Sequence, residues 1–203
     1  MLVAAAGLLL GGFLHPQEDE ALTGAQQTGA WLGDPAWVPS HLLLLFGELL
    51  LIVGLLGLLT THPGLSTIAR RTGWVALVGA VLWAIEGVPH VLAAGDAEAA
   101  TTEDATPFFS AFQQVAPLVY PVVGLAVAAL ALVSRRSLTD PVFSACGTVG
   151  GTAYALAPLL EGLAGIDELD FLYVLGLLMA VWFAAVGATE LGRRLNRQAT
   201  SIE

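Results

Sequence analysis

The chain has 203 residues, of which 56% are hydrophobic and only 12% are charged, and its mean hydropathy is +0.78. Soluble domains carry about 25% charged residues, so this composition is typical of a protein that resides in lipid. The net charge of −10 argues against a nucleic-acid partner, because nucleic-acid binding calls for a basic face. All seven basic residues are arginine. A retinal Schiff base and a P-loop both require a lysine, so the sequence excludes them. The single cysteine, Cys146, excludes a disulfide within the chain and a thiolate-held iron–sulfur cluster.

Six apolar stretches predict an all-α bundle of transmembrane helices that forms one integral membrane domain over residues 1–203. The first stretch is short, about 20 Å as a helix, but it has neither the basic start nor the small-residue cleavage site of a signal peptide. We therefore expect a short first span that is retained. The predicted spans cover residues 2–14, 37–61, 74–95, 107–133, 141–165 and 171–191.

The placement of arginine predicts the orientation of this bundle. Every arginine follows the second, fourth or sixth span, whereas the charges in the other three loops are all acidic. Lys and Arg in short loops concentrate on the cytoplasmic side of a membrane. We therefore expect a multi-pass protein of the cell membrane, with both termini in the cytoplasm and the acidic loops outside. The bias toward alanine, glycine, leucine and valine, with the negative net charge, suggests a prokaryotic source.

A weak internal repeat accompanies this layout. The third span aligns with the fifth, so that Gly79 matches Gly150 and Ala84 matches Ala155. This alignment indicates a duplicated helix hairpin in parallel orientation, unlike the inverted repeats of many transporters. The alternative is coincidence, since helices rich in alanine and leucine produce such matches by chance.

Ionisable side chains within the spans mark where chemistry could occur, because their burial in hydrocarbon costs a few kcal/mol. Glu86 and His90 stand four residues apart, on one face near the outer end of the third span. His41 and Glu48 share a face of the second span, with Glu48 about 10 Å deeper. With the predicted orientation, one polar set occupies the outer half of the membrane: His15, His41, Glu48, Glu86, His90 and Glu161.

Several interpretations of this polar set remain open. It could be a metal site, because imidazole and carboxylate groups are metal ligands and Glu86 and His90 offer two from one helical face. The candidate ligands are then His41, Glu86, His90, Glu161 and His15. It could instead hold haem b between two histidines, although haem ligands usually lie deeper within spans. A third interpretation is a proton or cation conduit through Glu48 and Glu86, for which the apolar inner half offers no continuation.

The alternative in a different class is a structural or accessory subunit without a ligand of its own. Histidines near an interface can stay solvated, and the carboxyl groups could bond to backbone atoms freed by Pro89 and Pro158. No zincin motif or nucleophile elbow occurs, so the sequence favours binding or structure over catalysis. Besides the lipid bilayer, the expected partners are a second copy of the chain or another membrane subunit.

The first sixty residues resemble a group of small polytopic membrane proteins of actinobacteria and haloarchaea. In that group a short first span ends in His-Pro, and W-x-x-(A/S)-H opens a second span rich in leucine and glycine. The matching residues are His15, Pro16, Trp37, Ser40 and His41. The resemblance implies the six-span plan and suggests that His15 and His41 belong to one feature, but it implies no activity. The leading hypothesis from the sequence is thus an outer polar site that binds a cation or a small polar ligand.

Overall fold

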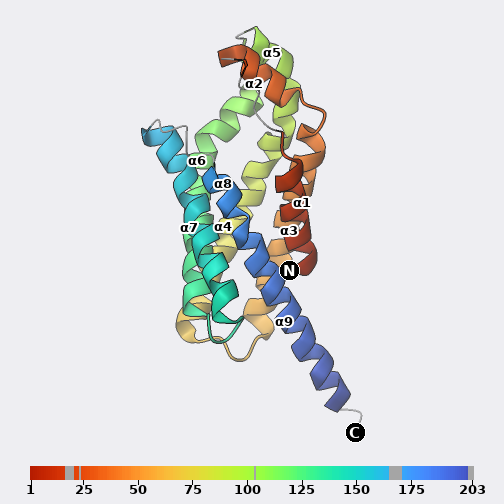
Figure 1. The fold of residues 1–203 in the computed structure, drawn as a ribbon, viewed down its shortest axis with the longest axis vertical. Helices are drawn as coiled ribbons and strands as arrows, with labels where there is room; N and C mark the ends of the chain where they lie inside the picture. Colours follow the sequence, from red (N-terminus) through yellow and green to blue (C-terminus); the bar gives the residue numbers. More distant parts are fainter. Residues whose placement is uncertain (17–20, 23, 103, 165–170, 201–203) are drawn as a thin grey trace.

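A computed structural model describes residues 1–16, 21–22, 24–102, 104–164 and 171–200, of which 161–164 and 200 are described by their backbone alone. These residues form helices joined by short connections, and no strand occurs among them. Figure 1 shows the long helices running side by side, with two short helices above them. The elements are α1 (Leu2–Leu14), α2 (Gly24–Leu32), α3 (Trp37–Thr61), α4 (Thr67–Leu92), a 3₁₀ turn η1 (Ala93–Asp96), α5 (Ala97–Thr101), α6 (Pro107–Val133), α7 (Pro141–Ala164), α8 (Phe171–Gly176) and α9 (Leu178–Thr200).

Five helical segments of the described chain are long and apolar enough to cross a membrane. They correspond to α3, α4 with its extension, α6, α7, and α8 with α9. The remaining predicted span, the first, is α1, which has the expected bounds but only 13 residues. At about 1.5 Å per residue α1 is shorter than the roughly 30 Å hydrocarbon core.

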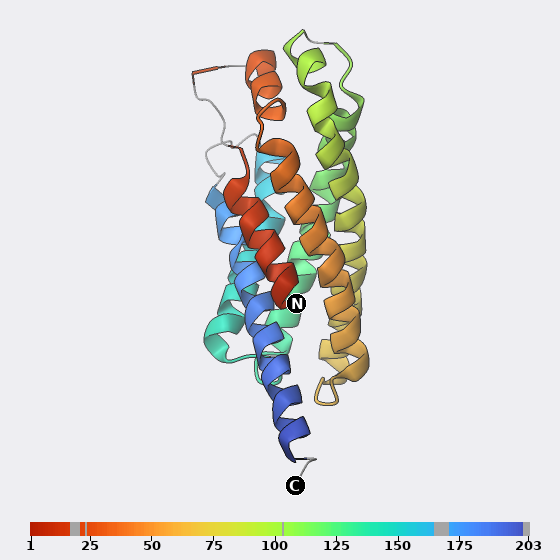
Figure 2. The ribbon, with the colours of Figure 1, turned by 90° about the vertical axis from the view of Figure 1, so that its right-hand side faces the viewer.

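The six principal helices form a closed ring, in which neighbours pack in the order α1, α3, α4, α6, α7 and α9, and α9 returns to α1. Figures 1 and 2 show α1 beside α3, with α9 along its other side. Small residues allow the closest approaches. A Cβ on Gly151 of α7 would lie 2.5 Å from the carbonyl oxygen of Gly124 of α6, so no larger residue fits there.

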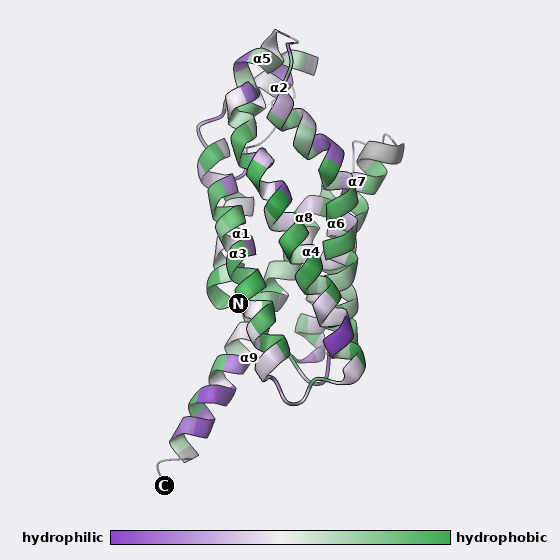
Figure 3. Ribbon diagram, turned by 180° about the vertical axis from the view of Figure 1, so that it is seen from behind, coloured by the Kyte–Doolittle hydropathy of each residue, from purple (hydrophilic) through white to green (hydrophobic). Residues whose placement is uncertain are grey.

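The outward face of the bundle is apolar, as lipid requires. Phe13, Leu118 and Val142 are each more than 70% exposed, and many other large apolar side chains also point outward. Figure 3 shows hydrophobic residues along the length of the bundle and hydrophilic ones at its two ends and on the last turns of α9. Among the described residues, charged side chains are therefore confined to the two ends of the bundle, except for the buried Glu48 and Glu86.

The structure differs from the sequence prediction in three connections and in the last predicted span. The region predicted as a polar loop over 15–36 contains α2, and the loop over 95–106 contains η1 and α5. Helix α4 begins at Thr67 rather than at residue 74, because Ser66 caps it by accepting a hydrogen bond from the Ala69 amide at 3.2 Å. The predicted sixth span is interrupted between α8 and α9, and α9 continues beyond residue 191 to Thr200.

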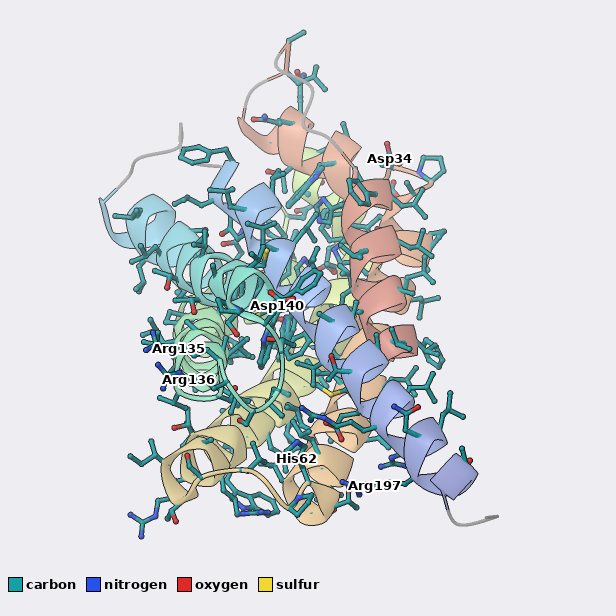
Figure 4. The ribbon with its side chains drawn as sticks, turned by 60° about the horizontal axis from the view of Figure 1, so that its bottom comes forward. Asp34, His62, Arg135, Arg136, Asp140 and Arg197 are labelled. Atoms are coloured by element: carbon teal, nitrogen blue, oxygen red, sulfur yellow. The ribbon has the colours of Figure 1, made fainter. Side chains whose placement is uncertain are left out.

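The end that carries the arginines is held together by a cluster of hydrogen bonds. Arg193 of α9 contacts Glu190 at 2.5 Å and donates at 2.7 Å to the carbonyl of Ser137, between α6 and α7. Glu190 also lies 3.3 Å from the ring of His62, the residue that ends α3. Figure 4 shows His62 with Arg135, Arg136 and Arg197 at this end and Asp34 at the opposite end.

Candidate metal centre

Three histidines from three helices meet at the end of the bundle away from the arginines. His15 directly follows α1, His41 lies in the second turn of α3, and His90 lies in the last turn of α4. The ring centroids of His15 and His41 are 4.8 Å apart, and those of His41 and His90 are 4.3 Å apart. One ring nitrogen from each histidine lies within 4.8 Å of the other two. We call these residues the histidine triad.

The hydrogen bonds of the triad fix which nitrogen each ring offers. His15 Nδ1 lies 3.0 Å from the Pro16 carbonyl oxygen, and His41 Nδ1 lies 2.7 Å from the Trp37 carbonyl oxygen. A carbonyl can only accept, so both Nδ1 atoms carry the hydrogen and both Nε2 atoms keep a lone pair. The Nε2 atoms of His41 and His90 are buried and have no hydrogen-bond partner.

Glu86 and Tyr120 orient the third ring from behind. Glu86 Oε1 lies 3.3 Å from His90 Nδ1, and the Tyr120 hydroxyl lies 3.4 Å from both of these atoms. Glu86 and Tyr120 thus engage His90 at Nδ1, and Nε2 is the ring nitrogen that is left without a partner. Metal-binding histidines typically hold their second nitrogen to a carboxylate or a carbonyl in this way. All three rings therefore have the arrangement of metal ligands.

Aromatic side chains enclose the triad. Trp37 packs against the ring of His41 at 4.2 Å, and its indole N–H donates at 3.0 Å to the His90 carbonyl, which ties the start of α3 to the end of α4. Phe112 of α6 stacks on the His90 ring at 4.1 Å. Trp31 of α2 lies 5.6 Å from the His15 ring and donates to the Pro16 carbonyl at 3.2 Å. Helix α2 therefore covers the site.

Burial lowers the pKa of His15 below its usual value of 6.5, while the hydrogen bond to the Pro16 carbonyl acts in the opposite direction. The net shift favours the neutral ring. Metal ions bind the neutral form of imidazole, so the surroundings of His15 keep it in the form that can act as a ligand.

The positions of the triad nitrogens suit a transition metal. Zinc–nitrogen bonds of about 2.0–2.1 Å in tetrahedral geometry put the nitrogens about 3.4 Å apart, so each ring would move inward by less than about 1 Å. Calcium and magnesium prefer oxygen ligands, whereas imidazole suits zinc, copper, nickel and iron. The donor set therefore fits a borderline transition metal better than a hard cation.

The other members of the predicted polar set have different positions. Glu48 is buried, with Oε2 unpartnered and packed so closely on α4 that a Cβ on Gly87 would lie 2.9 Å from it. Glu86 is also buried, but it contacts His90 through Nδ1 and so supports a candidate ligand. Glu161 belongs to α7, and its side chain lies outside the described part of the structure.

Sequence reasoning did not single out the residues that surround the triad. Tyr120, Phe112 and Trp31 come from helices other than those of the histidines, so their contacts depend on packing that no local pattern reveals. Asp96, in a loop whose charges are all acidic, is buried and accepts the amide hydrogens of Phe108 and Phe109 at 2.7 and 2.8 Å. The N-cap position of α6 is Thr106, so no local pattern pointed to Asp96.

In the described residues, the fold and surface thus define a helical protein with five helices suited to a membrane and a cluster of three histidines near one end, of which His41 is buried and the other two are half-buried. Comparison with family models, with curated proteins and with solved structures gave no match for the chain.

Proposed function

We propose that this chain is a six-span membrane protein that binds one transition-metal ion at the outer end of its bundle, through His15, His41 and His90. The observation that carries the proposal is the convergence of three imidazoles whose Nδ1 atoms are all engaged, while the Nε2 atoms of His41 and His90 are buried without partners. An unpaired buried nitrogen costs about 1–3 kcal/mol, and a bound metal would remove that cost.

The proposed orientation follows from the distribution of charge. The arginines lie at the start of α4, after α6 and in the last turns of α9, at the end of the bundle opposite to the triad, and basic loops favour the cytoplasm. Both termini are then cytoplasmic, and the metal is taken from outside the cell. Residues such as Glu98 at the outer end would raise the local concentration of cations, with less effect at high salt.

Haem b fits this packing less well than a single ion. The planes of His41 and His90 are inclined by 34° at a centroid distance of 4.3 Å, and Phe112 stacks on the outer face of the His90 ring. Two axial ligands must approach a flat macrocycle from opposite faces, and rings in direct contact leave no gap for one.

A titration with Zn²⁺ tests the proposal. The protein would be purified in detergent, treated with a chelator and titrated by calorimetry. We expect one Zn²⁺ per chain in the wild type. Loss of a residue that only supports a ligand typically weakens metal binding by up to about 100-fold, so the loss of a ligand in His41→Ala or His90→Ala should weaken it by more than that.

His62→Ala is the matched control, since His62 is a buried histidine at the other end of the bundle and should leave Zn²⁺ binding unchanged. If the wild type binds no Zn²⁺, or if all four proteins bind it equally, the metal proposal is wrong. The triad would then serve only the packing of a structural or accessory subunit.

A further inference from the structure

The triad supplies fewer ligands than a structural metal site uses. Structural zinc sites have four protein ligands, whereas catalytic and exchangeable sites have three and keep one position open. Among the described side chains, the histidine triad is the one group of histidine, cysteine and carboxylate residues close enough to share an ion. The identity of the fourth ligand therefore decides what the centre can do.

The nearest carboxylate is directed away from the metal position. Glu86 contacts His90 at Nδ1, and the two nitrogens of an imidazole ring point in different directions, so a carboxylate at Nδ1 cannot also bind an ion at Nε2. The Tyr120 hydroxyl lies 3.4 Å from the same Nδ1 atom and is on the same side of the ring. Both groups position His90 and neither can complete the coordination shell.

Glu48 lies too deep in the bundle, relative to the triad, to act as the fourth ligand. It lies seven residues beyond His41 on α3, about 10 Å further along the helix, and its carboxyl oxygen packs against Gly87. The Ser40 hydroxyl lies 3.3 Å from His41 Nδ1, so it too is on the side of the ring away from Nε2.

The charge of the site favours an anion in the remaining position. Three neutral imidazoles leave the two positive charges of the metal uncompensated in the first shell. Trp31, Trp37 and Phe112 replace water around the rings, and a low dielectric strengthens the attraction between unlike charges. Glu86 offsets part of this charge, but only from the far side of His90.

We infer that the metal centre has an open fourth coordination position, which takes a small monodentate anion. This inference rests on the proposed metal site and adds the class of external ligand that the site binds. It predicts an exchangeable centre, in contrast to a closed structural ion.

Cobalt substitution with azide as the probe tests the inference. Co²⁺ in a site of low coordination number absorbs visible light strongly, and the bands shift when a ligand changes. The purified full-length protein would be loaded with Co²⁺, freed of excess metal and titrated with azide. We expect a band shift that saturates at one azide per bound Co²⁺, in the wild type and equally in His62→Ala.

Two outcomes separate the possible failures. A Co²⁺ spectrum that azide leaves unchanged would overturn the open position, although the metal site itself would stand. Failure of the protein to retain Co²⁺ would overturn the metal site, and the inference with it.

Glu86→Gln adds an independent arm. If Glu86 acts from behind His90, the variant should bind Co²⁺ about 10–100-fold more weakly and, once loaded, should show the same shift with azide. If the wild type gives no shift and Glu86→Gln gives one, Glu86 is the fourth ligand and the inference is wrong.

Discussion

At the scale of single residues, the site depends on the direction in which each imidazole is held. His15 and His41 donate Nδ1–H to carbonyl groups of neighbouring residues, and Nδ1 of His90 contacts the carboxyl group of Glu86 on its own helix. Each Nδ1 atom is therefore engaged by a partner that is close in the sequence. The separation of four residues between Glu86 and His90 was visible in the sequence, but it supports one ligand rather than providing two.

The supporting role of Glu86 leads to a prediction for Zn²⁺ affinity. In Glu86→Gln a neutral amide group replaces the carboxyl group that contacts His90 at Nδ1, so the ring becomes a weaker ligand. We expect the dissociation constant measured by calorimetry to rise about 10–100-fold. Glu190→Gln, at the opposite end, should leave it unchanged, and equal affinities in both variants and the wild type would contradict this role.

Glu48 leads to a prediction for stability. Its Oε2 atom is buried without a partner, and a buried unsatisfied polar group costs about 1–3 kcal/mol. Glu48→Met, which keeps a similar length without the charge, should raise the free energy of unfolding by about that amount while Zn²⁺ binding persists. A marked loss of stability in a denaturant titration would instead reveal a bonding role for Glu48.

At the scale of helices, local sequence accounts for much of what is observed. The predicted ranges 2–14, 37–61 and 107–133 coincide with α1, α3 and α6, because the largely apolar runs begin or end there at histidine, proline or polar residues. Helix α2 escaped prediction because its segment GAQQTGAWL is mostly polar or small, and it becomes ordered through packing against α5. The break between α8 and α9 likewise could not be predicted, because no proline marks it in the sequence.

The site itself could be predicted only in part. The depth of His15, His41 and His90 followed from the spans, and the structure brings these three together. The sequence did not reveal that Glu86 contacts His90 on the Nδ1 side, away from the proposed ion. Nor did it reveal that Tyr120 of α6 reaches the same nitrogen. Both contacts depend on how α4 rotates against its neighbours, which an apolar pattern without a marked polar face does not determine.

The contact between α6 and α7 leads to a prediction for a helix pair. A Cβ on Gly151 would clash with a backbone carbonyl of α6, and backbone cannot yield as a flexible side chain can. Gly151→Ala should therefore lower the free energy of unfolding by about 1–3 kcal/mol. Gly57→Ala is the control, because a Cβ there meets nothing within 4 Å. Equal stability of the two variants in detergent would contradict the close packing of this pair.

At the scale of the whole molecule, the metal would join three helices that are distant in the sequence. Its ligands come from the ends of α1 and α4 and the start of α3, so binding should stabilise the fold by linkage. At a free Zn²⁺ concentration of 100 times the dissociation constant, we expect a gain of about 2.7 kcal/mol. A chelator should reverse the rise in Tm, and His41→Ala should show no such rise at all.

The orientation of the molecule can be tested by labelling with a maleimide that does not cross membranes. In a Cys146→Ala background, Glu98→Cys near the triad and Arg136→Cys at the basic end provide a matched pair of exposed sites. We expect intact cells to label the former alone, and permeabilised cells to label both. Labelling of Arg136→Cys alone in intact cells would reverse the orientation and place the triad on the inside.

The most direct test of the metal centre is the X-ray absorption spectrum of the Zn²⁺-loaded protein. We expect Zn²⁺ to have nitrogen or oxygen neighbours at about 2.0–2.1 Å, with the multiple-scattering signature of three imidazoles. The spectrum should be the same in His62→Ala. A spectrum with sulfur neighbours, or one with an oxygen shell and no imidazole signature, would contradict the binding of metal by His15, His41 and His90.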